Sequence, residues 1–425
     1  MPLFCLARRL VARAVMVGLV GGLWLSVANA AELNTASAPV RQALQAAWQQ
    51  HPSYRATEAQ LAAARARLDA AGQPLYNPEL EFASDDEGPD RTTTAGLNLT
   101  LDLSGKRRVR RDAAAARVDQ ATAEARLRRR DFAEQWFASW ADSQTASERV
   151  RTGERRIGLM ARFAELAQKQ FAADDISGLE RDLALLARDE AQAEQAQLIA
   201  EQAEAQARFR AVGGSSKVFA NLTLPTDALL PPVVTDTSIE QLPDWQAVQA
   251  AALAAEREVS VARRNRIADP TIGAYGGRKR YDNDGPSDNV VGVSVSIPLF
   301  IRNSYRAEVV AAQAEADVAV ADAERVRIEL EANQRRAIDS YAAAQSTWTR
   351  WKGSRGTDVE RRTTLLERLW REGELSTADY LQQLKQTLDT QLARAELEAR
   401  LWRSYTDYLA ATGQLERWSG LEGTP

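Results

Sequence analysis

The sequence predicts a mainly α-helical protein with a β contribution, made of duplicated long helical hairpins and four amphipathic strands. Three observations lead to this fold class. Alanine-rich stretches with helical spacing run for tens of residues without proline, as in 106–172. Short stretches alternate strictly between apolar and polar residues, as in 97–103, which is the period of a strand with one apolar face. The same order of segments then occurs twice in the 425-residue chain.

Residues 1–30 predict a secretory signal peptide. Three arginines precede a short apolar run, and Ala28-Asn29-Ala30 supplies a small-x-small cleavage pattern. The alternative, an uncleaved membrane anchor, needs a longer apolar run. The only cysteine, Cys5, lies here, so the mature chain has no thiol for a disulfide or a thiolate metal site.

The mature chain is moderately acidic. Without the three arginines of the signal, 51 basic residues stand against 58 acidic ones, and this balance disfavours nucleic acid as a partner. No stretch after Ala30 is apolar enough to cross a bilayer as a helix. Insertion into a membrane therefore has to use the strands.

The first repeat is predicted at 31–214. Its hairpin of strands has one apolar face, and its helices end at glycine-containing stops. In chain order we expect a helix at 39–72 interrupted at His51-Pro52, a strand at 78–83, an acidic turn at 84–91, a strand at 93–103, a long helix at 106–172 and a return helix at 178–212.

A proline-containing linker at 215–238 separates the repeats, and the second repeat is predicted at 239–413, followed by a C-terminal tail at 414–425. Matching positions support the duplication: Asn77-Pro78 with Asp269-Pro270, Ser139-Trp140-Ala141 with Ser340-Tyr341-Ala342, and Gly214 with Gly413. In chain order we expect a helix at 245–267, a strand at 270–279, an acidic turn at 281–289, a strand at 291–297, one long helix at 302–372 and a return helix ending at 412–413.

The lengths of the segments predict their packing. In each repeat two short helices placed end to end match one long helix, which reaches roughly 97 Å at 1.5 Å per residue. A chain then offers four strands at one end, with two open edges that hydrocarbon does not tolerate. Three chains would supply twelve strands, an even number typical of outer-membrane barrels. The acidic turns would be the outer loops, and the basic run 106–111 would lie near the inner lipid boundary.

At this point the sequence resembles the TolC-type outer membrane efflux factors. The resemblance covers nearly all of 39–413 and rests on the two repeats and on short motifs. The motifs are D-D-I-S-G-L-E at 174–180 and G-E-L-S-T-A-D-Y-L at 373–381, which are similar to the family's hairpin tips, and V-S-I-P-L-F at 295–300, which is similar to its strand-to-helix signature. The stretch L-D-L-S-G-K-R at 101–107 resembles the heavy-metal branch, the CzcC-like proteins.

The resemblance implies a homotrimer with a twelve-stranded β-barrel in the outer membrane and an α-helical barrel in the periplasm. It implies docking to a periplasmic adaptor (a membrane fusion protein) and an inner-membrane RND pump. The chain is then a passive exit duct for divalent heavy-metal cations, with outer membrane lipid around it, no cofactor and no enzymatic role. The same duct could instead serve drug efflux or type I secretion. A periplasmic coiled-coil scaffold or an adaptor is the alternative of another class.

The resemblance also implies where the site lies. Asp379 occupies the first aspartate position of the family's periplasmic aperture, and Gln382 stands where some members carry a second aspartate. Asp379 has a second reading, because Ser376-x-x-Asp379 is a capping pattern. The tips offered for adaptor docking are Asp174, Asp175, Ile176, Ser177, Gly373, Glu374, Leu375 and Ser376, of which the charged ones could equally be solvated.

Other conspicuous residues have plainer interpretations. His51 is the only histidine, and one histidine without cysteine cannot build a transition-metal site. The tryptophans of the long helices, Trp136, Trp140, Trp348 and Trp351, are expected to be packing residues. The basic run 106–111 is expected to anchor the chain at the membrane boundary. No Ser/His/Asp arrangement or phosphate loop is present in the sequence.

Overall fold

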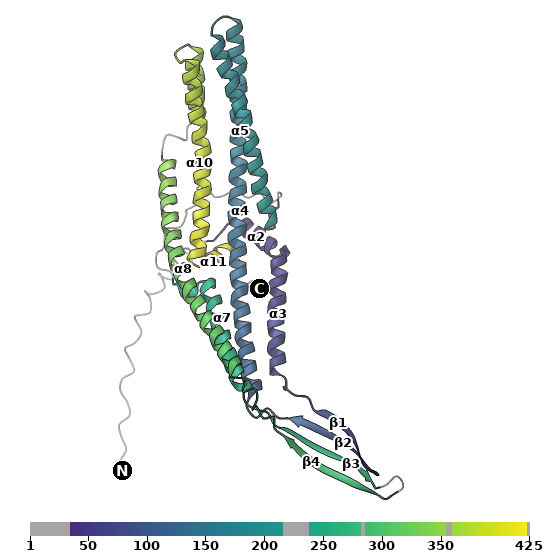
Figure 1. Cartoon of the computed structure of the whole chain (residues 1–425). Coiled ribbons are helices and arrows are strands. Elements are labelled where there is room, and N and C mark those ends of the chain that lie inside the picture. The colour runs from purple at the N-terminus through teal and green to yellow at the C-terminus, as the bar shows by residue number, and fades with distance from the viewer. Residues whose placement is uncertain (1–34, 216–237, 282–284, 354–358, 423–425) are drawn as a thin grey trace, which may run out of the picture.

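The computed structural model describes residues 35–215, 238–281, 285–353 and 359–422. The predicted signal peptide and almost all of the predicted linker lie outside these ranges. The chain forms a long helical rod that carries a single sheet at one end, bent away from the rod axis (Figure 1). No described helix is both long and apolar enough to cross a membrane.

The helical rod begins with α2 (Ala38–Gln50) and α3 (Pro52–Gly72), which are separated at His51. His51 caps α3, since its Nδ1 accepts from the Ser53 N–H at 3.2 Å. The long helix α4 (Lys106–Ala172) and the return helix α5 (Gly178–Ala211) complete the helices of the first half. The interruption predicted at His51-Pro52 is therefore a helix boundary.

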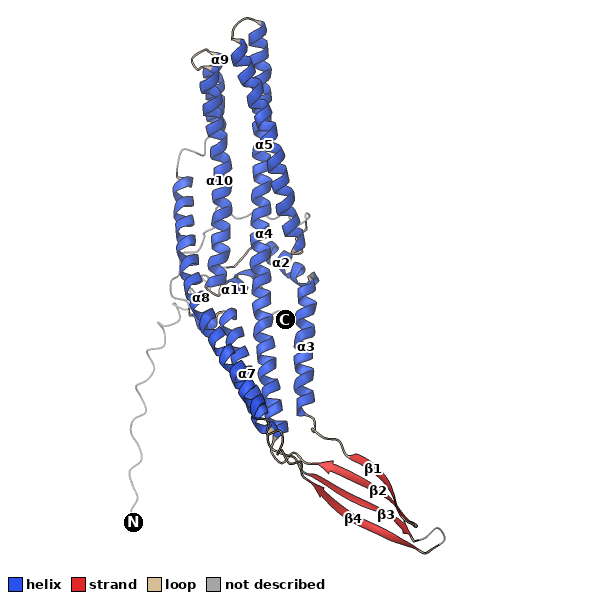
Figure 2. Cartoon of the chain, in the orientation of Figure 1, coloured by secondary structure: helices blue, strands red, loops and turns tan. Residues whose placement is uncertain are grey.

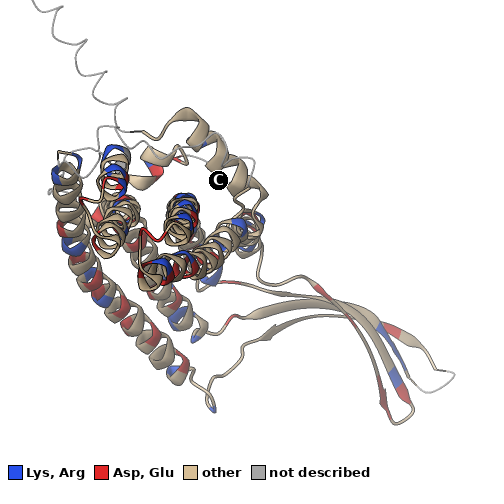
Figure 3. Ribbon diagram, turned by 90° about the horizontal axis from the view of Figure 1, so that it is seen from above, with Lys and Arg blue, Asp and Glu red and all other residues tan. Residues whose placement is uncertain are grey.

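The second half repeats this order. The 3₁₀ turn η1 (Ile239–Gln241) precedes α7 (Pro243–Asn265), and α8 (Arg306–Lys352), α9 (Val359–Arg371) and α10 (Thr377–Ala411) follow the strands. Helices α3, α4, α7 and α8 lie side by side in that order, each next to the following one. Seen from above, the helices follow an arc, and the sheet leaves it on one side (Figure 3).

Four antiparallel strands form the sheet, in the order β1 (Glu79–Glu87), β2 (Asp90–Thr100), β3 (Thr271–Arg280) and β4 (Ser287–Ser296) (Figure 2). The register aligns apolar side chains across the strands, because residues two apart share a face. One face carries the rows Leu99/Ile272/Val295, Leu80/Leu97/Ala274/Val293 and Phe82/Ala95/Gly276/Val291. We call this the apolar face.

Strand passes into helix through a left-handed residue in both halves. Gly105, just before α4, has φ 74°, and Tyr305, just before α8, has φ 53°. Tyr305 is held there by Asn303, whose Oδ1 accepts the Tyr305 N–H at 2.9 Å, and its ring packs against Phe300 at 5.0 Å. The same backbone device therefore redirects the chain twice.

Two buried clusters stabilise the rod. The larger lies at mid-height and joins α2, α4, α8, α10 and α11 (Leu415–Ser419) around Trp48, Trp136, Trp140, Tyr341 and Tyr408. The smaller lies near the tips, around Phe163, Trp370, Tyr380 and Leu384. Of the tryptophans expected to be packing residues, Trp136, Trp140 and Trp348 are buried in the larger cluster, and Trp351 packs against it.

Several predicted boundaries differ from the structure. The acidic turn at 84–91 is mostly strand: Ser84–Glu87 pair with 90–93, and only Gly88 and Pro89 connect β1 to β2. The polar residues suggested a loop, yet a strand beyond the apolar rows can carry polar groups on both faces. The helix predicted at 302–372 is two helices, with α8 ending at Lys352 beside Gly353 and α9 beginning at Val359.

The segment predicted as a tail is part of the core. Helix α11 buries Leu415, and Leu421 beyond it is also buried. The Glu416 carboxylate pairs with Arg129 at 2.9 Å, and the Gly420 carbonyl accepts from the Gln45 side chain at 2.7 Å. The segment has many charged residues, so its apolar spacing was not recognised in the sequence. The spacing becomes clear only from its packing against α2 and α4.

Candidate functional site

The second tip is organised by a helix cap. The Ser376 hydroxyl accepts the Asp379 N–H at 3.1 Å and donates to the Asp379 carboxylate at 2.6 Å. Next to it, the indole N–H of Trp370 donates to the hydroxyl of Thr377 at 3.2 Å, and both side chains are buried. Asp379 therefore lies in the first turn of α10 and at the same time remains exposed to solvent. The capping interpretation and the aperture interpretation are compatible in this geometry.

One face of α10 is exposed and polar near its start. Asp379, Gln382, Gln386 and Asp389 recur at helical spacing on this face. The opposite face carries Tyr380, Leu384, Thr387 and Leu388, which are buried. A shallow hollow of about 550 Å³ follows the polar face from Gln382 to Ala393. The structure thus places Asp379 and Gln382 on one surface, directly after the tip.

Ion pairs tie α10 to the first hairpin. Arg156 of α4 is buried, and its guanidinium lies 2.5 Å from Glu194 of α5 and 3.2 Å from Asp389 of α10. About one turn nearer the tip, Lys385 of α10 lies 2.5 Å from Glu190 of α5. This hydrogen bond raises the pKa of Lys385 and lowers the pKa of Glu190. Residues from both repeats are therefore linked beside the polar face.

The first tip has a complete capping box. Ser177 accepts the Glu180 N–H at 3.2 Å, and the Glu180 carboxylate accepts the Ser177 N–H at 2.9 Å. The bond from the Ser177 backbone lowers the pKa of Glu180. Asp174 takes a left-handed conformation, φ 60°, at the position that Gly373 occupies in the second tip, φ 74°.

The two tips share apolar packing beneath their polar ends. Ile176 of the first tip and Leu375 of the second both pack against the smaller cluster. Asp174, Asp175 and Glu374 are exposed, and no ion pair of theirs occurs among the described residues. The tips consequently present a polar surface on a shared apolar base.

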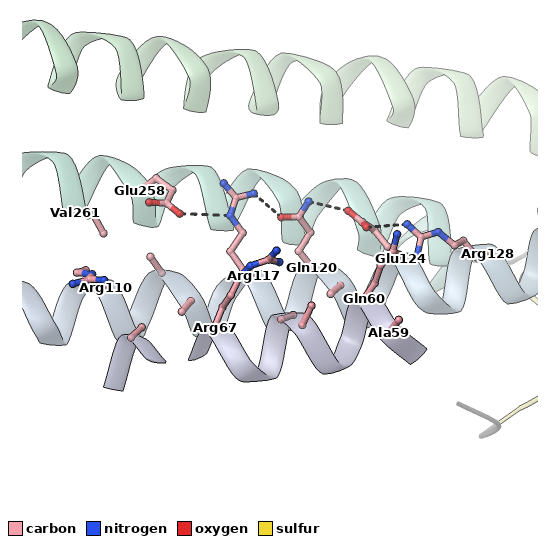
Figure 4. A pocket seen from close by; sticks show the side chains of 16 residues that line it. Ala59, Gln60, Arg67, Arg110, Arg117, Gln120, Glu124, Arg128, Glu258 and Val261 are labelled. Carbon is pink, nitrogen blue, oxygen red and sulfur yellow. Dashed lines mark hydrogen bonds and ion pairs between the residues drawn. The ribbon is translucent and has the colours of Figure 1, made fainter. Parts of the chain in front are cut away.

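A polar groove runs between α3, α4 and α7, nearer the sheet (Figure 4). Glu258 of α7 reaches across it to Arg117 of α4 at 3.5 Å, and further contacts run along α4 from Arg117 to Gln120 at 3.0 Å and from Gln120 to Glu124 at 2.9 Å. Its base is mostly alanine, so the helices approach closely and the long side chains stand above them. The groove is a charged surface of the helical wall.

The second face of the sheet is polar and closely fitted. Tyr275 lies over two glycines of neighbouring strands: a Cβ on Gly96 would lie 2.9 Å from the Tyr275 Cβ, and one on Gly292 would lie 2.4 Å from its Cζ. Asn98 on this face donates to Glu81 at 2.7 Å. We call this the polar face. The sheet is therefore amphipathic along the apolar rows, with a different chemistry on each side.

A buried ion pair joins the sheet to the helices. Lys106 Nζ lies 2.8 Å from Asp269 Oδ2, and the Tyr76 hydroxyl donates to the same oxygen at 2.8 Å. Asp102 accepts the N–H groups of Lys106 and Arg107 at 2.8 Å each. Burial raises the pKa of Asp102, but these bonds outweigh it and leave the pKa lowered. Within the basic run 106–111, Lys106 is therefore not available to anchor the chain at a lipid boundary, because its ammonium is buried against Asp269. For the exposed arginines of the run, anchoring stays a prediction.

No group of three or more His, Asp or Glu side chains able to hold a metal ion occurs in the described ranges. His51, the single histidine, is occupied as a helix cap and packs against Phe132 at 5.0 Å. The chemistry of the candidate site is thus that of a charged surface.

Sequence reasoning missed the ion pairs between the hairpins. Lys385 and Glu190 are separated by 195 residues, and Arg156 and Asp389 by 233. Nothing local distinguishes these residues from the many other charges of the helices. Only the matched lengths of the two hairpins, which bring α5 beside α10, could have indicated them.

The described residues form one architecture, in which a four-stranded antiparallel sheet continues into a wall of long helices. Residues 234–414 match the family model described as "Outer membrane efflux protein". This match covers the second half of the chain, which is similar to this family over that segment.

Curated relatives and a solved structure are also similar to this chain. The chain is 29% identical over 254 residues to the cobalt-zinc-cadmium resistance protein CzcC of Cupriavidus metallidurans, covering 57% of this chain and 60% of the relative. It is 26% identical over 299 residues to the nickel-cobalt-cadmium resistance protein NccC of Alcaligenes xylosoxydans xylosoxydans, covering 69% and 66%. Both matches thus span less than two thirds of the relative.

The fold is similar to that of the Campylobacter jejuni CmeC outer membrane channel, with a TM-score of 0.73, 14% identity, and coverage of 89% of this chain and 86% of that one. The mainly helical fold with a β contribution is therefore confirmed.

Proposed function

We propose that this chain is the outer membrane channel component of a tripartite, RND-type efflux system. Three copies close a barrel of twelve strands in the outer membrane, and the helices continue it as a tunnel through the periplasm. The duct is passive and carries divalent heavy-metal cations that the pump delivers.

The observation that carries this proposal is the unpartnered amphipathic sheet. Two of its three apolar rows cross all four strands, and Leu80, Phe82, Val291 and Val293 are between 67% and 84% exposed. In the chain as described, the outer edges of β1 and β4 have no neighbour. Hydrocarbon accepts such a sheet only when its edges are closed, and pairing β4 of one copy with β1 of the next closes them.

The helical wall has matching free edges. Helix α8 exposes Val310, Val318 and Ile328, and α3 lies at the other end of the row of helices. The same rotation that joins β4 to β1 brings α8 of one copy to α3 of the next. The wall and the barrel then close around one axis.

The tips form the periplasmic aperture in this assembly. Three copies of Asp379 near the axis, each with Gln382 one turn further along, attract cations and disfavour one another's ionisation. The polar ends of the tips, Asp174 to Ser177 and Gly373 to Ser376, face the adaptor. The ion pairs of Arg156 and Lys385 hold α10 against α5 and so favour a narrow aperture.

Support for metal cations as cargo comes from the curated relatives, whose names state resistance to cobalt, zinc, cadmium and nickel. A deletion strain tests the cargo. We expect growth to be inhibited at lower cobalt, zinc or cadmium concentration and to be restored by the wild-type chain, while sensitivity to dyes stays unchanged. Sensitivity to dyes alone would move the cargo to organic compounds.

Fractionation and reconstitution test the duct itself. The mature protein should pellet with outer membranes, require detergent, have the mass of three chains and conduct ions across a planar bilayer. A monomer that stays in solution without detergent would contradict the proposal and favour a periplasmic scaffold.

A further inference from the structure

Three arginines stand at the outer end of the apolar face of the sheet. Arg91 of β2 and Arg280 of β3 are partners in the register, and Arg278 lies two residues before Arg280. Because side chains two apart share a face, these arginines lie on the same side as Leu97 and Ala274, beyond the last apolar row. We call them the basic rim.

The basic rim has an excess of positive charge. Arg91 is paired with Asp86, with Nε 2.6 Å and Nη2 3.0 Å from the two carboxylate oxygens. Arg278 and Arg280 are exposed, and within the described ranges no carboxylate contacts either of them. Arg91 and Arg280 are also directly opposite each other, an arrangement that disfavours the sheet unless an anion lies between them.

The polar face has the opposite charge at the same height. Lys279, between the two arginines in sequence, points to that side and lies 3.4 Å from Asp90 and 3.7 Å from Glu87. Asp85 and Asp288 are in its register row. Among the described residues at this end of the sheet, positive charge is therefore in excess only on the side that carries the apolar rows. In Figure 3 the charged residues of the sheet gather toward its far end.

The depth of the rim matches a lipid headgroup. Arg278 is one row and Arg280 two rows beyond the Phe82/Ala95/Gly276/Val291 row. At about 3.3 Å per residue along a strand, this places their Cα atoms roughly 7 and 13 Å past the last apolar row. Guanidinium groups at this distance reach the phosphates of the lipids whose chains cover the rows.

We propose that the basic rim binds the phosphate groups of a phosphorylated lipid in the outer leaflet of the outer membrane. Arginine suits this ligand because its planar fork engages phosphate with two hydrogen bonds. The inference rests on the proposed function, since it requires the apolar face to lie in lipid. Three such rims in a trimer give each subunit its own lipid site, outside the duct.

The test uses the full-length mature trimer purified in detergent, with bisphosphorylated lipid A as the probe and native mass spectrometry as the readout. The variant Arg278→Gln/Arg280→Gln removes both unpaired charges. Because each basic residue near an anionic lipid surface adds to the binding, we expect retention of the lipid to fall by about tenfold or more. Lys279→Gln is the matched control: it removes one charge from the same strand, on the other face, and should leave retention unchanged.

Two further measurements compare the binding of lipid phosphate with the binding of free inorganic phosphate. Monophosphorylated lipid A should be retained less than the bisphosphorylated form, and inorganic phosphate at millimolar concentration should not displace either. Displacement by inorganic phosphate would mean an ion site without lipid specificity and would overturn the proposal. The variant Arg278→Lys/Arg280→Lys keeps the positive charge but loses the planar guanidinium, so its retention of lipid A should lie between that of the wild type and that of the glutamine variant. If the glutamine variant fails to assemble, lipid retention by the lysine variant equal to that of the wild type overturns the proposal.

The outcomes separate a failure of the basic-rim proposal from a failure of the proposed channel function. A wild-type protein that forms no conducting trimer contradicts the proposed duct. A conducting trimer whose glutamine variant retains lipid A as well as wild type contradicts the basic rim alone.

Discussion

The ammonium nitrogen of Lys106 lies 2.8 Å from a carboxylate oxygen of Asp269, and the two side chains are 8% and 2% exposed. The residues are 163 positions apart, one in each half of the chain. Lys106 begins α4, and Asp269 comes two residues before β3. A single buried ion pair therefore fixes the junction of sheet and helices across both halves.

Removing one partner of this pair should destabilise the protein strongly. Asp269→Asn leaves the Lys106 charge buried without compensation, at a cost of about 3–5 kcal/mol. Thermal unfolding followed by circular dichroism should show a large loss, whereas Arg108→Gln, a change at an exposed neighbour, should show almost none. The double variant Lys106→Met/Asp269→Leu should recover much of the loss; a double variant as unstable as Asp269→Asn would contradict this account.

A small side chain at Gly96 should disturb the sheet. The added Cβ of Gly96→Ala would lie 2.9 Å from the Tyr275 Cβ and 3.2 Å from the Ala274 carbonyl oxygen, so strand positions must shift, at about 1–3 kcal/mol. We expect a smaller fraction of heat-resistant trimer on electrophoresis. Gly276→Ala is the control, because its Cβ meets nothing closer than 3.8 Å. Equal loss in both variants would show that strand flexibility, and not the fit to Tyr275, is at issue.

Substitutions at Asp379 and Ser376 separate the helix cap from the negative charge that Asp379 places at the proposed aperture. Asp379→Asn removes the charge but keeps the N–H that Ser376 accepts, so the helix should retain most of its stability. In planar bilayers we expect weaker preference for cations over anions and weaker block by divalent cations. Ser376→Ala, which removes the cap and keeps the charge, should cost about 1 kcal/mol and leave ion selectivity intact. Unchanged selectivity in Asp379→Asn would place this residue away from the pore.

Loss of the Arg156 guanidinium should free α10 from the first hairpin. Arg156→Met leaves Glu194 and Asp389 without the cation they share, and charged hydrogen bonds of this kind contribute about 2 kcal/mol. Spin labels on exposed positions of α5 and α10 should report a broader distance distribution, and bilayer conductance should rise. The exposed neighbour Arg155→Met should change neither quantity, and a narrow distribution in Arg156→Met would refute the role of the pair.

The Lys385–Glu190 pair should make this coupling sensitive only to strong acid and to strong base. The lowered pKa of Glu190 means that its stabilisation is complete above its ordinary value of 4.5 and is lost as pH falls through the folded value. The raised pKa of Lys385 means that its share is complete below 10.5 and is lost as pH rises further. Distances between α5 and α10 should therefore stay constant from about pH 5 to 9. A change within that range would assign the titration to another group.

Local patterns predicted much of this molecule. The alternation of Leu97, Leu99 and their partners identified the strands, and Ser177 with Glu180 identified the start of α5, because these signals depend only on near neighbours. The extension of β1 through Ser84–Glu87 was not predictable in this way. Those residues are polar on both faces, and only their pairing with 90–93 makes them a strand.

Contacts between residues far apart in the sequence were the main features that local patterns did not predict. Lys106 belonged to a basic run that pattern alone assigns to a membrane boundary, and its burial follows from Asp269 in the other half. Arg156 and Lys385 likewise have no local signature. Charge pairs of this kind depend on which helices meet, and the sequence states this only through the lengths of the hairpins.

The turn between β1 and β2 consists of Gly88 and Pro89, with Gly88 at φ 66°. In the proposed orientation this turn faces the exterior of the cell. A turn so short exposes very little polypeptide to antibodies, phages and proteases at this point of the molecule. An epitope inserted at this turn would make the protein visible from outside.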